Sequence, residues 1–196
     1  MSTALDNLLT QVNACRLCES QLEHGVRPVL QASPEATILV AGQAPGAKVH
    51  ATGIPFNDPS GDRLREWMGI DRKTFYDPQK IAILPMGFCY PGKGKSGDLP
   101  HLKICGELWQ DKVFTELKSA KLIVLIGKYA QDYYLKDNIK MNLTDRVKDF
   151  KSYLPKYFVL PHPSPRNNIW QAKNEWFKHL VLPEFKDWTT SILGKH

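Results

Sequence analysis

The chain has 196 residues, 42% of them hydrophobic and 23% charged, which is the balance of a globular protein with a substantial core. This length predicts a single domain over residues 1–196, and the longest apolar runs, such as 122–126, are too short to cross a bilayer, which argues against a membrane protein. The net charge of +6 favours a polyanionic partner such as nucleic acid.

The first residues, MSTALDNLLTQVNAC, contain no basic segment followed by an apolar core. They therefore predict that no signal peptide is present and that the protein is cytoplasmic. We also expect the protein to be a monomer.

Four short apolar runs predict buried strands, and stretches with helical character lie between them. In chain order, the strands are expected at 37–42, 80–85, 121–127 and 156–161. Helices are expected at 60–70, 106–120, 128–137 and 171–188, and Pro183 should kink or end the last of them. Strands that are apolar throughout and alternate with helices predict a three-layer α/β/α fold with a central four-stranded parallel sheet.

Unusual loops follow three of the four predicted strands: GQAPG at 42–46, MGFCYPGKGK at 86–95 and HPSPRN at 162–167. Because the carboxyl ends of parallel strands meet at one edge of the sheet, these loops should converge there and form the active cleft. In the last loop His162 lies among three prolines, which stiffen the backbone around it.

The four cysteines fall into two pairs, one spaced C-x2-C and the other C-x15-C. Structural disulfides are not expected in a cytoplasmic chain. Four unrelated buried thiols remain one interpretation. We favour the other, a metal or iron–sulfur site that uses all four side chains. Ligand count does not separate zinc from a [4Fe–4S] cluster, because both accept four thiolates, here Cys15, Cys18, Cys89 and Cys105.

A basic loop, residues 90–104, lies between the second pair of cysteines. It carries Lys93, Lys95 and Lys103 and one acid, Asp98. Such a loop is a plausible contact for a phosphate backbone. The alternative is a solvated surface loop with no ligand.

The motifs GQAPG, TGIPF with SGDRL, and HPSPRN, in this order on an α/β chain, resemble the uracil-DNA glycosylase superfamily. The cysteine plan is similar to that of the family 4 enzymes, which carry a [4Fe–4S] cluster. The resemblance implies a uracil-DNA glycosylase-like fold and a DNA partner. It also implies base-excision repair chemistry, in which a deaminated base, above all uracil, is flipped out and its N-glycosidic bond is hydrolysed.

The resemblance also implies roles for particular residues. His162 would donate a hydrogen bond to the departing base, Phe56 would stack on it, and Gln43 would contact the base or the attacking water. Pro165 would wedge the duplex and Arg166 would meet a phosphate, with Lys93 and Lys95 as further DNA contacts. The remaining positions expected to line the base site are Gly42, Ala44, Pro85 and Ser164.

The pattern departs from family 4 at two places. Gln43 and Ala44 stand where relatives have an acid, and Pro85 stands in place of the asparagine that reads the pyrimidine. Asn57 is the expected water-positioning residue. The other candidates to replace the missing acid are His50, Asp58 and Asp62. Three alternatives therefore stay open: a glycosylase for another base, a weakly active or non-catalytic damage-binding protein, and a hydrolase or transferase of free nucleosides or nucleotides.

Overall fold

A parallel four-stranded sheet forms the centre of the molecule, as the computed structural model describes it for residues 3–136 and 140–194. The strands lie in the order β2–β1–β5–β6. All four fall inside the predicted ranges and end one or two residues sooner, at β1 Ile38–Ala41, β2 Ile81–Ile83, β5 Leu122–Ile126 and β6 Tyr157–Leu160.

The strands are apolar throughout because both faces of the sheet are covered. Every residue of β1, β2 and β5 is buried. The central strand β1 pairs with β5 from Ile38 opposite Leu122 to Ala41 opposite Leu125. Nearly continuous Val, Ile and Leu runs are typical of parallel strands that meet helices on both sides.

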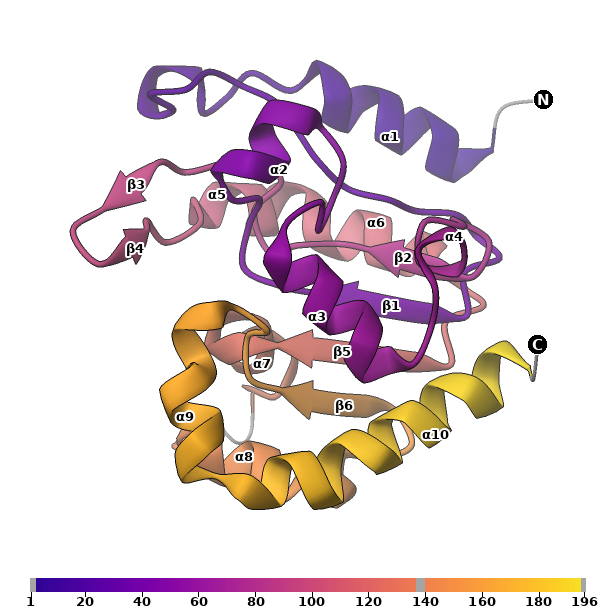
Figure 1. Ribbon diagram of the computed structural model, residues 1–196. Helices are drawn as coiled ribbons and strands as arrows, with labels where there is room; N and C mark the ends of the chain where they lie inside the picture. The colour runs from indigo at the N-terminus through magenta and orange to yellow at the C-terminus, as the bar shows by residue number, and fades with distance from the viewer. Residues whose placement is uncertain (1–2, 137–139, 195–196) are drawn as a thin grey trace.

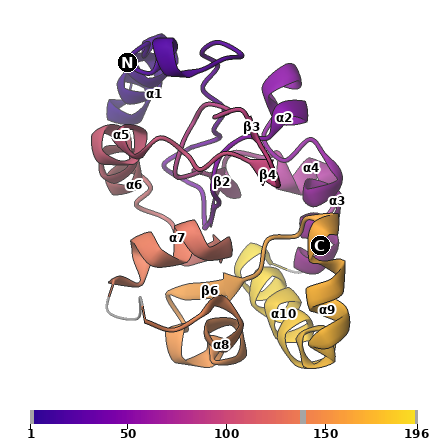
Figure 2. The same ribbon diagram turned by 90° about the vertical axis from the view of Figure 1, so that its left-hand side faces the viewer.

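Helices form a layer on each side of the sheet (Figures 1 and 2). On one side, α3 (Pro59–Met68) packs against α10 (Leu182–Leu193). On the other side, α1 (Ala4–Ala14) packs against α6 (Asp111–Glu116). The predicted three-layer α/β/α fold is confirmed. The other helices are α2 Ala47–Thr52, α4 Arg72–Phe75, α5 Lys103–Cys105, α7 Gly127–Tyr134, α8 Leu143–Lys148 and α9 Asn168–Lys173.

Helix α1 was not among the predicted elements, although its sequence carries a start signal. The Thr3 side chain accepts from the Asp6 amide at 3.1 Å, and the Asp6 carboxylate accepts from the Thr3 amide at 2.8 Å. This reciprocal pair is a capping box, which satisfies amides at the start of the helix. Leu5 and Val12 then anchor the helix in the core.

Two predicted helices differ in detail from the structure. The range 106–120 is a π-helical turn over Gly106–Gln110 followed by α6. The range predicted as a helix at 171–188 is interrupted at Asn174, and of the two outcomes expected at Pro183, a kink or an end, the end is wrong, because helical turns continue past it to Leu193. A π-helical turn, Phe177–Val181, lies directly before α10, and Pro183 falls in the first turn of α10, where a missing amide costs little.

A small antiparallel hairpin extends from the carboxyl edge of the sheet. It consists of β3 (Lys93–Gly94) and β4 (Gly97–Asp98) and lies within the predicted basic loop. Figure 2 looks onto this edge, where the hairpin lies near α2 and in front of the sheet. Among the described helices, none has the length and apolar character needed to span a membrane.

Candidate functional site

A cavity of about 280 Å³ opens at the carboxyl edge of the sheet. The loops after β1, β2 and β6 all contribute to its wall, as the sequence predicts, and the hairpin adds a fourth side. Eight of the predicted site residues line it: Gly42, Gln43, Ala44, Phe56, Pro85, His162, Ser164 and Arg166. The central expectation, that His162, Phe56 and Gln43 lie around one space, is therefore met in geometry.

The His162 ring is held in one tautomer. The Ser164 backbone amide donates to Nδ1 at 3.1 Å, so Nδ1 carries the lone pair and Nε2 carries the proton of the neutral ring. Burial lowers the pKa of His162 below its ordinary value, and the nearby carboxylates of Asp58 and Asp98 oppose this shift only partly. The residue is thus a neutral N–H donor at neutral pH.

The HPSPRN loop is braced from both sides of the histidine. The Asn167 side chain donates to the His162 carbonyl at 2.7 Å. From α3, the Arg63 guanidinium donates to the Ser164 carbonyl at 3.2 Å and to the Asn168 side chain at 2.8 Å. These bonds, with the prolines, fix the direction of the imidazole.

Phe56 lies in a strained backbone conformation. Its φ is +52°, in the left-handed region that non-glycine residues seldom adopt. The buried Arg65 donates to the Phe56 carbonyl at 3.3 Å, and Gly61 approaches the same carbonyl so closely that an added Cβ would lie 1.7 Å from the oxygen. Phe75 packs edge-on against the Phe56 ring, with centroids 6.1 Å apart. Backbone strain held by such support is typical of functional sites.

Gln43 and Arg166 both hold the hairpin over the cavity. The Gln43 side-chain amide donates to the Leu99 carbonyl at 2.9 Å, and the Arg166 guanidinium donates to the Ser96 carbonyl at 3.3 Å. Neither contact follows from sequence, because the partners are separated by 56 and 70 positions. Arg166 has further N–H groups, so this bond does not use its whole donor capacity.

Asn57, the expected water-positioning residue, does not line this cavity. Its side-chain oxygen accepts from Arg72 at 2.8 Å. Asp62 pairs with Arg65, and His50 Nε2 bonds to the His24 carbonyl at 3.0 Å. Of the candidates to replace the missing acid, only Asp58 lines the cavity.

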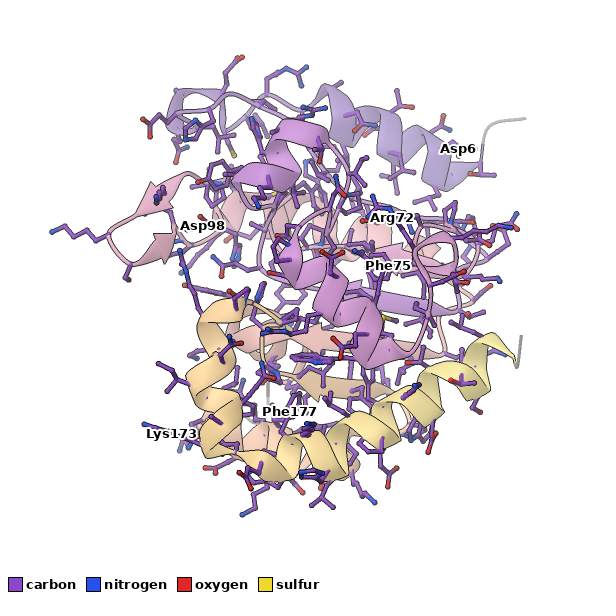
Figure 3. All side chains as sticks on the ribbon, viewed as in Figure 1. Asp6, Arg72, Phe75, Asp98, Lys173 and Phe177 are labelled. Atoms are coloured by element: carbon purple, nitrogen blue, oxygen red, sulfur yellow. The ribbon has the colours of Figure 1, made fainter. Side chains whose placement is uncertain are left out.

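A second carboxylate on the cavity wall, Asp98, was not among the candidates. Sequence placed it in a basic loop, and only the hairpin brings it toward the body of the molecule (Figure 3). An acid directly after a glycine in a Gly- and Lys-rich loop gives no periodic signal. Its only hint was its position between the second pair of cysteines.

The remaining predicted DNA contacts lie outside the cavity wall. Lys93 and Lys95 are exposed on the hairpin, and Pro165 is exposed at the start of a 3₁₀ turn, Pro165–Asn167. These positions suit contact with a large polyanion, because the side chains are open to solvent at the same edge as the cavity.

The four cysteines converge on a second cavity, of about 30 Å³. All four are free thiols and all line this cavity, together with apolar side chains such as Leu22 and Leu108. The Phe88 amide donates to the sulfur of Cys105 at 3.3 Å. Burial raises the pKa of the Cys105 thiol to about 12, and the other cysteines add to the shift, so this thiol is protonated at neutral pH when no ligand is bound.

A single metal ion would require these thiols to be closely grouped. In the described parts of the chain, no three or more Cys, His, Asp or Glu side chains are grouped closely enough to hold one metal ion. Zinc–sulfur bonds of about 2.3 Å require the sulfurs to lie about 3.8 Å apart.

The cavity lies beyond the carboxyl ends of the strands of a parallel sheet. This is the place where open α/β proteins bind their ligands, so the fold and the cavity define a protein of that class. Within that class, the family model described as "Uracil DNA glycosylase superfamily" matches residues 30–186. The chain therefore belongs to the uracil DNA glycosylase superfamily. Cys15 and Cys18 lie before the matched residues, so the match does not include the first cysteine pair.

Proposed function

We propose that this protein is a monofunctional DNA glycosylase of the family 4 type, which flips a deaminated base, uracil above all, out of DNA and hydrolyses its N-glycosidic bond to leave an abasic site. The observation that carries the proposal is the cavity in which the neutral His162 donor and the strained, supported Phe56 lie together. Superfamily membership supports glycosylase chemistry in general.

His162 supplies the donor for the leaving base. As the glycosidic bond breaks, negative charge develops on the base oxygen, and an N–H fixed in direction stabilises that charge without reorganising. A neutral imidazole suits this task, because its Nε2–H donates a hydrogen bond to the base and keeps its proton while doing so. The brace from Asn167 and Arg63 keeps the ring oriented before substrate arrives.

Phe56 offers a surface for the flipped base. Stacking on an aromatic ring contributes about 1–3 kcal/mol per base, which helps to offset the cost of unstacking the duplex. Pro165 would enter the duplex beside the flipped nucleotide, while Lys93 and Lys95 would meet phosphates. Arg166 joins these contacts through the donors that its bond to Ser96 leaves available.

Base discrimination should be weak in this site. Pro85 has no side-chain donor or acceptor, and the amides that follow it are already used. The Met86 and Gly87 amides donate to the carbonyls of Gly42 and Gln43 at 2.8 and 2.9 Å. A site without a dedicated edge-reading group rejects wrong bases less strongly. We therefore expect excision of uracil with limited discrimination against other deaminated bases.

The four cysteines would hold a [4Fe–4S] cluster. Their shared cavity, their free thiols and the N–H bond to the Cys105 sulfur support this assignment, with zinc as the alternative that metal analysis would reveal. When bound, the cluster supplies a structural link, because it joins the segment after α1 to the segment between β2 and α6. No step of hydrolysis needs it.

The test is a panel of oligonucleotides, each with one uracil, hypoxanthine, xanthine or thymine, in single-stranded and duplex form. Alkali-labile sites in the deaminated substrates, lost in His162→Ala, support a glycosylase. Tight binding without cleavage of any substrate points to a damage-binding protein. Turnover of free nucleosides alone contradicts the proposal.

A further inference from the structure

Among the described residues, two carboxylates line the cavity, and they differ in what else they bond. Asp58 is the N-cap of α3, and its side chain accepts from the Gly61 amide at 2.9 Å. Within the described parts of the chain, the Asp98 side chain has one hydrogen-bond contact, a long one of 3.5 Å from the Tyr90 hydroxyl. A carboxylate accepts several hydrogen bonds, so Asp98 retains the greater capacity to bind a water molecule.

The hairpin places Asp98 against the loop that follows β1. One of its carboxylate oxygens would lie 3.4 Å from a Cβ added at Gly46, the residue that precedes α2. The position is fixed from three directions. Gln43 holds the Leu99 carbonyl, Arg166 holds the Ser96 carbonyl, and the Leu99 amide donates to the Gly92 carbonyl at 2.9 Å.

The electrostatic evidence agrees with this placement. Asp98 lies near enough to His162 to raise the pKa of the imidazole against the larger lowering by burial. Asp98 is also an exposed residue, so water reaches it from solvent. An anion at this point favours the positive charge that develops on the sugar as the glycosidic bond breaks.

We propose that Asp98 is the catalytic carboxylate of this site, and that it holds and polarises the attacking water. This inference rests on the proposed glycosylase function. It also assigns Gln43 a positioning role, because the amide that stands where relatives carry an acid anchors the hairpin that bears Asp98.

The step balances without a further reactant. The C1′–N bond breaks and its electron pair leaves on the base, whose oxygen accepts the hydrogen bond from His162 Nε2. The water oxygen forms the new bond to C1′, and its proton passes to the Asp98 carboxylate and then to solvent. The base anion takes a proton from water after release.

The experiment compares single-turnover cleavage and DNA affinity for the wild type and the variants Asp98→Asn and Asp98→Glu. Loss of a general base lowers rates by about 10²–10⁴-fold, so we expect Asp98→Asn to lose at least about 100-fold in rate. Removing a negative charge should leave DNA affinity equal or tighter. Asp98→Glu should recover part of the rate, and formate should partly restore Asp98→Ala.

Two matched controls separate this role from others. Asp58→Asn preserves the α3 cap, since asparagine is also a good N-cap, and its loss in rate should be smaller than that of Asp98→Asn. Ser96→Ala changes a side chain on the same hairpin but keeps the carbonyl that Arg166 binds, and should behave as wild type.

The assignment is overturned if Asp98→Asn cleaves at the wild-type rate. It is also overturned if Asp58→Asn loses much of the rate and Asp98→Asn loses none. In both cases the glycosylase function still stands. A wild-type protein that cleaves no substrate contradicts the proposed function itself, which is a different result. A fall in rate that only mirrors weaker DNA binding also overturns the assignment, because a water-binding role leaves affinity intact.

Discussion

At the scale of single residues, the proposed chemistry depends on keeping His162 neutral. Its Nδ1 accepts from Ser164, and burial lowers its pKa from the ordinary value of 6.5, against the opposing charges of Asp58 and Asp98. Both effects favour the same protonation state. The neutral imidazole that the proposed chemistry needs is therefore the protonation state that the folded protein stabilises.

This arrangement predicts the direction of the pH dependence. With the imidazole pKa lowered, the active neutral form persists as pH falls to 6.5, and the rate declines only below that value. Single-turnover rates between pH 5 and 8, with circular dichroism to confirm folding at each point, check this. An acid limb at or above pH 6.5 would show that His162 is not a buried neutral donor. His162→Ala is the control, and it should lose this acid limb together with most of the activity.

At the scale of elements, the start of α3 determines the position of Phe56. The helix begins with an aspartate cap, Asp58, followed by Pro59, and Gly61 then lies directly beneath the Phe56 carbonyl. Arg65, one turn further along, donates to that carbonyl. The short distance between Gly61 and Phe56 leaves no space for a side chain.

We predict that Gly61→Ala destabilises the protein and reduces excision. The added Cβ would lie 1.7 Å from the Phe56 oxygen, so the strained residue must move, at a cost of about 2 kcal/mol or more. Chemical denaturation measures the free energy of unfolding. Gly106→Ala is the matched control, because its Cβ would meet its nearest atom at 3.5 Å and the change should be neutral or slightly stabilising. Equal stability of the two variants would contradict this explanation.

The helices and strands also show how much of the fold can be predicted from the sequence. The apolar runs predict all four strands of the central sheet and their parallel arrangement, because burial on both faces leaves a direct trace in composition. The hairpin was predicted only as a loop, since its short strands depend on distant contacts from Gln43 and Arg166. For the same reason, sequence reasoning proposes Asn57 and does not include Asp98 among the candidates: neighbours in sequence can be recognised, but partners across the fold cannot.

At the scale of the whole molecule, the four cysteines connect two distant parts of the chain. Cys15 and Cys18 follow α1, whereas Cys89 and Cys105 flank the loop that contains the hairpin. A cluster there would link the α1 layer to the segment that carries Asp98. The sequence pattern predicted the set of four, and the structure brings all four to one cavity.

We predict that the purified protein is brown, with roughly 400 nm absorbance as expected for this cofactor class, and that Cys105→Ala loses the colour. Because a bound structural group adds folding energy, melting should occur about 5 °C or more lower in that variant. Iron and sulfide analysis with calorimetry measures both effects. A colourless wild type with one zinc per chain would contradict the cluster.

The central claim is that the cavity accepts a base and that His162 assists its departure. Mass spectrometry of free base released from a uracil-containing oligonucleotide, measured together with abasic sites, tests it most directly. We expect equal amounts of both products from the wild type, and at least about a 100-fold slower release from His162→Ala. Release of uracil at the wild-type rate by His162→Ala would contradict it.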